Sequence, residues 1–217
     1  MVGSASDPGF WIGSGLIGGV ESIGFRVQLD KVGNKTEYTG NFRIGLEIEG
    51  DDDVDLFLGP KLNGNAASQG IVFQLAGSDT NTSPSTTSLG NTTDLIAFTA
   101  ENYNYQVNPN DPADFNGTPD AILTFALSFA ALNTYISSNW SSIYNGTNVD
   151  GQGNPLDSAP TISGSSVLRF IAFTATQTNS INQDLFGIDG IQPDVTFSGG
   201  GGFSAPTFGD GTSAIPE

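Results

Sequence analysis

The chain has 217 residues, of which 37% are hydrophobic, and it carries 23 acidic against 6 basic side chains, a net charge of −17. It contains neither Cys nor His, which excludes disulfides, thiolate chemistry, Ser–His and Cys–His pairs and the commonest zinc ligand. The negative charge opposes binding to nucleic acid and to anionic lipid, and no apolar run is long enough for membrane insertion. We therefore expect a non-enzymatic protein with one sizeable core, since single β-sandwiches reach this length.

Apolar runs bounded by turn-forming residues predict a series of β-strands. The clearest two-residue alternation lies at residues 41–49, where Phe42, Ile44, Leu46 and Ile48 share one face. In chain order, the predicted strands comprise residues 23–29, 41–49, 54–59, 70–75, 94–100, 121–129 and 167–175. The last two are apolar on both faces, which is typical of central strands that are covered on each side.

One short helix and long loops are expected between these strands. The helix is predicted at residues 129–138, and a loop with buried anchor residues is the alternative. The apolar residues that share one side at helical spacing are Phe129, Leu132, Tyr135 and Ile136. Clusters of Gly, Ser, Thr, Asn and Pro predict loops at residues 78–91 and 144–163.

Together these elements predict an all-β fold. We expect an antiparallel β-sandwich of jelly-roll type, with one short helix and long loops. The sandwich is expected to span residues 1–197 as a single domain, and the Gly-rich residues 198–217 are predicted to form a C-terminal tail or tether.

A first acidic cluster lies at the turn of the predicted hairpin and comprises Asp51, Asp52, Asp53 and Asp55. Four carboxylates within five residues repel one another unless a cation lies among them. Because Ca²⁺ takes six to eight oxygen ligands, the cluster predicts a calcium site. The loop is not an EF-hand, since Leu56 and Leu62 occupy the positions of its Gly and Glu. The alternative is a solvated acidic turn that prevents edge aggregation.

A second acidic cluster precedes the predicted strand at residues 121–129. Gly117 can adopt a positive φ there and bring carbonyl groups inward, so calcium is again predicted; an ordinary Asx-turn loop is the alternative. The predicted ligands are Asp111, Asp114, Asn116 and Asp120. A third set, Asp150, Asn154 and Asp157, is interpreted as ordinary loop chemistry.

Carbohydrate contact and catalysis are the remaining possibilities for a site. Trp140 and Tyr144 are flanked by Ser and Asn and form the predicted sugar-stacking pair, whereas Trp11 is predicted to lie in the core. Anchoring of a loop is the alternative role for the tryptophans. A glycosidase would have to use carboxylates alone, and Glu47 and Glu49 share one strand face roughly 7 Å apart. Exposed glutamates on an amphipathic strand are the alternative interpretation.

Two segments resemble known β-sandwich proteins. Residues 42–59, FRIGLEIEGDDDVDLFLG, resemble the strand, acidic turn and strand of secreted bacterial proteins related to family 9 carbohydrate-binding modules and DOMON domains. Residues 120–132, DAILTFALSFAAL, are similar to the strand of those proteins that runs into a short helical turn. The resemblance covers residues 23–139 and implies a β-sandwich, in some members with bound calcium. The sugar-stacking tryptophans of that family are not matched in this chain.

The C-terminal part gives a second resemblance. Residues 176–185, the glycine run after Ser198 and the terminal sequence Ile215-Pro216-Glu217 resemble the end of a PEP-CTERM protein just before its sorting signal. Such proteins are processed by an exosortase in bacteria that make extracellular polysaccharide. The resemblance implies a secreted, extracellular or cell-surface location.

These observations predict a secreted, calcium-binding structural or binding protein of a bacterial cell surface or extracellular matrix. Its expected partners are an extracellular polysaccharide or further copies of itself. The alternative function is a carbohydrate-binding module for an extracellular polysaccharide, and a carboxylate-only glycosidase is the third.

Overall fold

A computed structural model of the chain describes residues 10–29, 41–48, 55–62, 69–75, 94–107, 120–144, 146–166 and 168–175. These residues form strands and one helix: β1 (Phe10–Ile17), β2 (Val20–Leu29), β3 (Asn41–Glu47), β4 (Leu56–Lys61), β5 (Gly70–Leu75), β6 (Asp94–Ile96), β7 (Tyr103–Val107), β8 (Ala121–Ser128), α1 (Phe129–Ile143) and β9 (Arg169–Ala175). The predicted loop at residues 78–91 and the tail at residues 198–217 lie outside the described residues.

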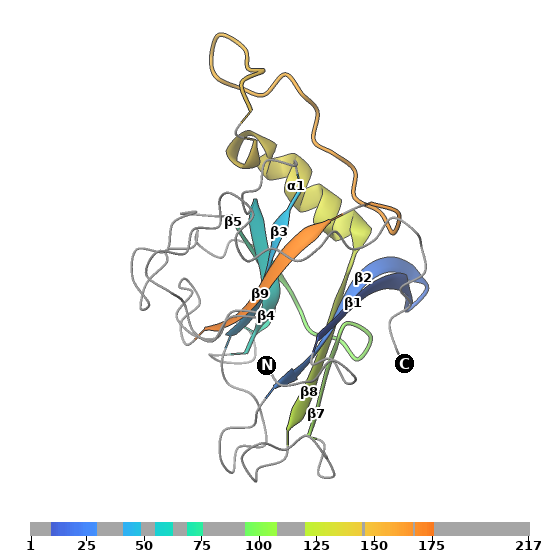
Figure 1. The fold of residues 1–217 in the computed structure, drawn as a ribbon. Coiled ribbons are helices and arrows are strands. Elements are labelled where there is room, and N and C mark those ends of the chain that lie inside the picture. The colour runs from blue at the N-terminus through green and yellow to red at the C-terminus, as the bar shows by residue number, and fades with distance from the viewer. Residues whose placement is uncertain are drawn as a thin grey trace.

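The strands form two antiparallel sheets that face each other (Figure 1). One sheet has the order β1-β2-β8-β7 and the other the order β6-β5-β4-β3-β9. The prediction of an all-β, antiparallel two-sheet fold with one helix is therefore confirmed. The jelly-roll topology stays a prediction.

The core fills the space between the two sheets, because each strand turns alternate side chains inward. The alternation predicted for β3 is confirmed, since Phe42, Ile44 and Leu46 are fully buried. The rings of Phe25 and Phe125 stack at 4.9 Å within one sheet, and Phe42 of the other sheet meets Phe125 edge-on at 6.0 Å. Burial of each such side chain stabilises the fold by roughly 1.5–3 kcal/mol.

Helix α1 covers one end of the sandwich and contacts β2 and β8 of one sheet and β5 of the other. Its first turn is capped by the Ser128 hydroxyl, which accepts a hydrogen bond from the Ala131 amide at 3.1 Å. The predicted buried side is confirmed, and Tyr135 stacks on Phe73 at 4.5 Å. The helix extends beyond its predicted end at residue 138 and ends at Ile143. The Ser and Asn residues in its last turns have low helix propensity, but the buried side chain of Ile143 packs this part of the helix against the core.

Strands β3, β4 and β5 also bury side chains on the outer face of their sheet, and some of these side chains are polar. Arg43 is fully buried, and its guanidinium donates to Gln74 Oε1 at 2.9 Å and to the Pro60 carbonyl at 2.8 Å. Phe57 and Val72 are buried on this face without belonging to the core between the sheets. This face is therefore not an open surface for a ligand.

Three expectations about the strands are wrong. β1 and β7 were not among the predicted strands, because glycines interrupt the pattern of β1 and β7 is short and polar. β9 is the terminal strand of its sheet among the described strands, although its apolar residues predicted a central position. Trp11 is half-buried and pairs with Arg26, so it lies on the outer face of its sheet and not in the core.

Within the described residues, no helix has the length and apolarity that crossing a lipid bilayer requires.

Candidate functional site

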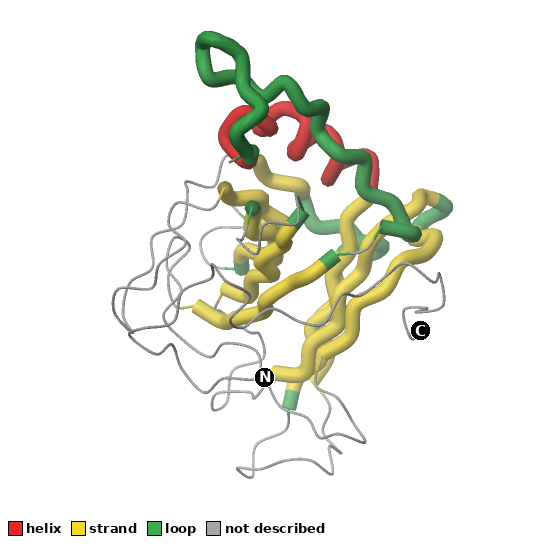
Figure 2. Tube along the Cα trace, turned by 45° about the horizontal axis from the view of Figure 1, so that its top comes forward, coloured by secondary structure: helices red, strands yellow, loops and turns green. Residues whose placement is uncertain are grey.

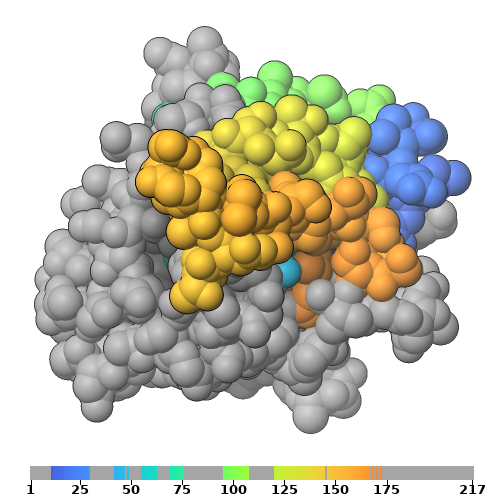
Figure 3. All heavy atoms as spheres, turned by 90° about the horizontal axis from the view of Figure 1, so that it is seen from above, coloured from blue at the N-terminus to red at the C-terminus, as the bar shows by residue number. Residues whose placement is uncertain are grey.

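The polar surface at the α1 end of the sandwich is formed by α1 and residues 146–166, which we call the helix–loop layer. The segment rises beyond the C-terminal end of α1 and returns beside the helix (Figure 2). Seen from above, the helix in yellow and the segment in gold and orange lie side by side (Figure 3). The layer places residues from both ends of α1 beside loop residues that are distant in the sequence.

Trp140 and Tyr144, the predicted sugar-stacking pair, contact each other in this layer. Their ring centroids lie 5.5 Å apart with the planes tilted by 49°, and both side chains are partly exposed. The Trp140 indole donates to the Asp157 carbonyl at 2.8 Å, and the Tyr144 hydroxyl donates to the Asp157 carboxylate at 2.6 Å. Asn148 donates from its side chain to the other carboxylate oxygen at 2.8 Å. Trp140 also packs against the core, so the pair anchors the loop as well as presenting aromatic surface.

The charge at Asp157 is stabilised by these donors. The hydrogen bond from the Tyr144 hydroxyl, followed by that from the Asn148 amide, holds the pKa of the Asp157 carboxyl below its usual range. The interpretation of Asp157 as ordinary loop chemistry does not include this position beside Trp140 and Tyr144. Its spacing from Trp140 gives no signal, because residues 141–156 separate them in the chain.

The tip of the segment is a small hydrogen-bonded turn. The Asp150 carboxylate accepts from the Gln152 and Asn154 amides, each at 2.8 Å, and Gly153 adopts a φ of 85°. The side-chain hydrogen bond from Asn154 is the main reason why the pKa of Asp150 is lowered. The interpretation of Asp150 and Asn154 as loop residues is therefore confirmed.

A second tether fixes the returning part of the segment to the middle of α1. The Asn133 side chain donates to the Ile162 carbonyl at 2.9 Å and accepts from the Ile162 amide at 2.8 Å. Ile162 itself is buried in the core. The next residues form a turn in which the Ser163 amide donates to the Ser166 hydroxyl at 2.9 Å. This tether places the turn at residues 163–165 beside β1.

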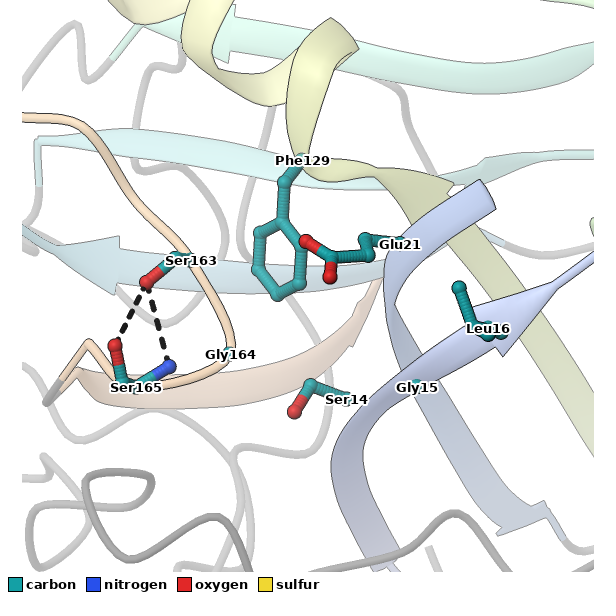
Figure 4. A pocket seen from close by; sticks show the side chains of 8 residues that line it. All are labelled: Ser14, Gly15, Leu16, Glu21, Phe129, Ser163, Gly164 and Ser165. Carbon is teal, nitrogen blue, oxygen red and sulfur yellow. Dashed lines mark hydrogen bonds between the residues drawn. The ribbon is translucent and has the colours of Figure 1, made fainter. Parts of the chain in front are cut away.

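A cavity of about 330 Å³ lies between this turn, the β1–β2 hairpin and the start of α1 (Figure 4). Side chains of different character line it: the Glu21 carboxylate, the Phe129 ring, the exposed Leu16, and the hydroxyls of Ser14, Ser163 and Ser165. The backbone of Gly164 comes close, because a Cβ atom there would lie 2.9 Å from Ser14 Oγ. The cavity is large enough to hold a small molecule.

The position of Glu21 follows from strand alternation. On β2 the inward positions run from Leu29 through Phe25 to Ile23, and the next inward position is Glu21. On β1 the inward position opposite Ile23 is Ser14. Glu21 is exposed and Ser14 is half-buried, so the inward face of this sheet becomes polar and open to solvent at this end. The signal in the sequence was a glutamate in register with the apolar residues of a strand, but the predicted strand began after it.

Each acidic cluster has only one of its predicted calcium ligands within the described residues, so both calcium sites stay predictions. Asp55 is buried and accepts a hydrogen bond from the Ile48 amide, and Asp120 is buried and accepts from the Gln28 side chain at 3.0 Å. In the described part of the chain, no group of three or more acidic side chains is placed to hold a metal ion. The remaining predicted ligands lie outside the described residues: Asp51, Asp52, Asp53, Asp111, Asp114 and Asn116.

The glutamate pair predicted for glycoside hydrolysis is only partly described. Glu47 is the last residue of β3 and lies opposite Arg169 of β9 in the register of the sheet. Glu49 lies outside the described residues. The distance between their carboxylates stays a prediction.

Comparison of the chain with protein-family models, with curated proteins and with solved structures finds no match. The fold therefore defines the class of the protein, an antiparallel two-sheet β protein with one helix over one end of the sandwich.

Replacement of Asp157 by Asn is expected to lower the melting temperature at neutral pH and to reduce its fall in acid. The folded carboxyl has a lower pKa than the unfolded one, so its contribution to stability is present above the unfolded value of about 3.9. That contribution is lost as the pH falls through the folded pKa. Thermal melts between pH 7 and pH 2.5 measure it, and equal losses in the wild type and the variant would contradict the assignment.

Proposed function

We propose that this protein is a secreted, non-catalytic β-sandwich of a bacterial cell surface or extracellular matrix, and that it acts by binding or assembly. The helix–loop layer is the observation that carries the proposal. Side chains of α1 tether residues 146–166 to the end of a packed sandwich. Binding residues are typically found on such loops, held in place by a rigid scaffold.

The composition supports the same class of function. Without Cys or His, the chain lacks thiolate nucleophiles, the commonest general base and the commonest zinc ligand. Its negative charge attracts cations and cationic groups. The resemblance to PEP-CTERM proteins supports the extracellular location, and it makes an extracellular polysaccharide or the protein itself the expected partner.

A polysaccharide is favoured as the ligand by the contact between Trp140 and Tyr144. Both rings are partly exposed beside the Asp157 carboxylate and the Asn148 amide, which can accept from and donate to sugar hydroxyls. The apolar C–H face of a sugar ring can stack on the face of an aromatic ring. Because the indole N–H and the phenol O–H already bind Asp157, a glycan would contact the ring faces and not these donors.

The chain offers a matched control for this site, because it has only two tryptophans. Trp140→Ala is expected to weaken binding on an array of bacterial exopolysaccharides at least tenfold, since loss of a stacked aromatic ring removes roughly 1.4 kcal/mol or more. Trp11 lies on β1, on the outer face of its sheet and outside the helix–loop layer, so Trp11→Ala is expected to leave binding unchanged. Melting temperatures of both variants report whether the fold is retained. Equal binding by the two variants, or concentration-dependent filaments without glycan binding, would count against the glycan and favour assembly.

Calcium binding is part of the proposal and concerns the two acidic loops. Asp55 and Asp120 are both buried, and each lies at the end of one of these loops next to a strand. A divalent ion among clustered carboxylates reduces their mutual repulsion, which is large in a chain with a net charge of −17. The proposed ligands in the first loop are Asp51, Asp52, Asp53 and Asp55, and those in the second loop are Asp111, Asp114, Asn116 and Asp120.

Removal of calcium is expected to lower the melting temperature by a few degrees. Extracellular calcium sites often have Kd values near 10⁻⁴ to 10⁻³ M, so a calcium concentration a few-fold higher adds about 1 kcal/mol. For a chain of this size that free energy corresponds to roughly 2–4 °C. Thermal melts in chelator, in millimolar calcium and in millimolar magnesium make the comparison. The same midpoint in all three, or an equal response to both ions, would show that the loops are solvated turns.

A further inference from the structure

The cavity at the start of α1 combines three kinds of group that recognise the same class of ligand. Glu21 supplies a carboxylate, Phe129 an aromatic ring, and Ser14, Ser163 and Ser165 supply hydroxyls. In Figure 4, Glu21 extends from β2 toward the Phe129 ring, Ser14 lies on the neighbouring strand β1, and Ser163 and Ser165 lie on the turn across from Glu21. With a volume of about 330 Å³, the cavity lies at the small end of the range of ligand sites.

Glu21 and Ser14 are held in place by their strands and not by their own side chains. Glu21 pairs with Leu16 and Ser14 pairs with Ile23 in the register of β1 and β2. Neither side chain makes a hydrogen bond or ion pair within the described residues. The polar atoms of both side chains therefore lie at the cavity, and no described residue forms a hydrogen bond or ion pair with them.

The electric field at the cavity favours a cation. Among the described residues that line the cavity, one side chain is acidic and none is basic. The N-terminus of α1 opposes a cation, but its dipole corresponds to only about half of an elementary charge, against the full charge of Glu21. The net charge of −17 also raises the concentration of cations near the protein.

The lining distinguishes among cations and neutral ligands. A Ca²⁺ ion requires six to eight oxygens, whereas this cavity offers one carboxylate, three hydroxyls and an apolar ring. A neutral polyol would gain hydrogen bonds but nothing from the charge of Glu21. An organic ammonium group gains from all three components: it pairs with the carboxylate, lies on the face of the ring, and, where it carries N–H groups, donates to the hydroxyls.

We infer that the cavity binds a small organic ammonium compound, with its charged group between Glu21 and Phe129. Its remaining atoms lie against Ser14 and the turn at residues 163–165. The inference concerns a site separate from the Trp140–Tyr144 pair, which lies at the opposite end of α1. It holds whether or not that pair binds a glycan.

Choline and its neutral isostere 3,3-dimethylbutan-1-ol test the inference directly, because they have the same shape and differ in charge. The 217-residue protein is titrated with each compound while its backbone amides are followed by NMR. Choline is expected to shift the amides of Ser14, Glu21 and residues 163–165 in a saturable manner, and to bind at least tenfold more tightly than the alcohol. Sodium chloride at matched ionic strength controls for screening.

Two glutamate variants give the matched comparison. Glu21→Gln is expected to weaken choline binding at least tenfold, whereas Glu101→Gln, which removes an equal charge from an exposed residue that does not line this cavity, is expected to change it less than twofold. Phe129→Leu is expected to reduce the preference for choline over the alcohol. Melting temperatures confirm that each variant is folded. Equal affinity for the two compounds, no effect of Glu21→Gln, or shifts confined to Trp140 and Tyr144 would overturn the inference.

Discussion

The packing of two sheets around a shared apolar core is the constraint on which the rest of this structure depends. Phe25 and Phe125 from one sheet and Phe42 from the other fill its centre, and the ends of such a sandwich must be closed by something apolar. Helix α1 closes one end with its buried side, including the stack of Tyr135 on Phe73. The helix is thus fixed by the core and not by its own helix propensity.

The position of α1 explains why the candidate sites lie at this end. Its outer side provides Asn133 and Trp140, which hold residues 146–166 by hydrogen bonds, and its first residue, Phe129, forms one wall of the cavity. The inward strand positions become polar at the same end, at Ser14 and Glu21. Polar groups are tolerated there because the cavity is open to solvent, whereas a buried carboxylate would require a partner.

The sequence predicted the features that depend on local pattern. The alternation in β3 and the apolar side of α1 were sufficient to identify both elements, because burial on one face leaves a period of two or of 3.6 residues. Features that depend on distant pairing were not predictable. Trp11 was interpreted as core because its neighbours are apolar, and only the register with Arg26 places it on the outer face. Asp157 and Glu21 became candidate site residues for the same reason, since tertiary packing brings them to Tyr144 and Phe129.

Amide hydrogen exchange tests the central claim that the core-fixed helix holds the loop in place. The Ile162 amide, which donates to the Asn133 side chain, is expected to exchange slowly in the wild type. In Asn133→Ala this amide is expected to exchange at least tenfold faster, while the amides of β2 and β8 keep their wild-type rates. An Ile162 amide that exchanges in the wild type as fast as in an unstructured peptide would contradict the account.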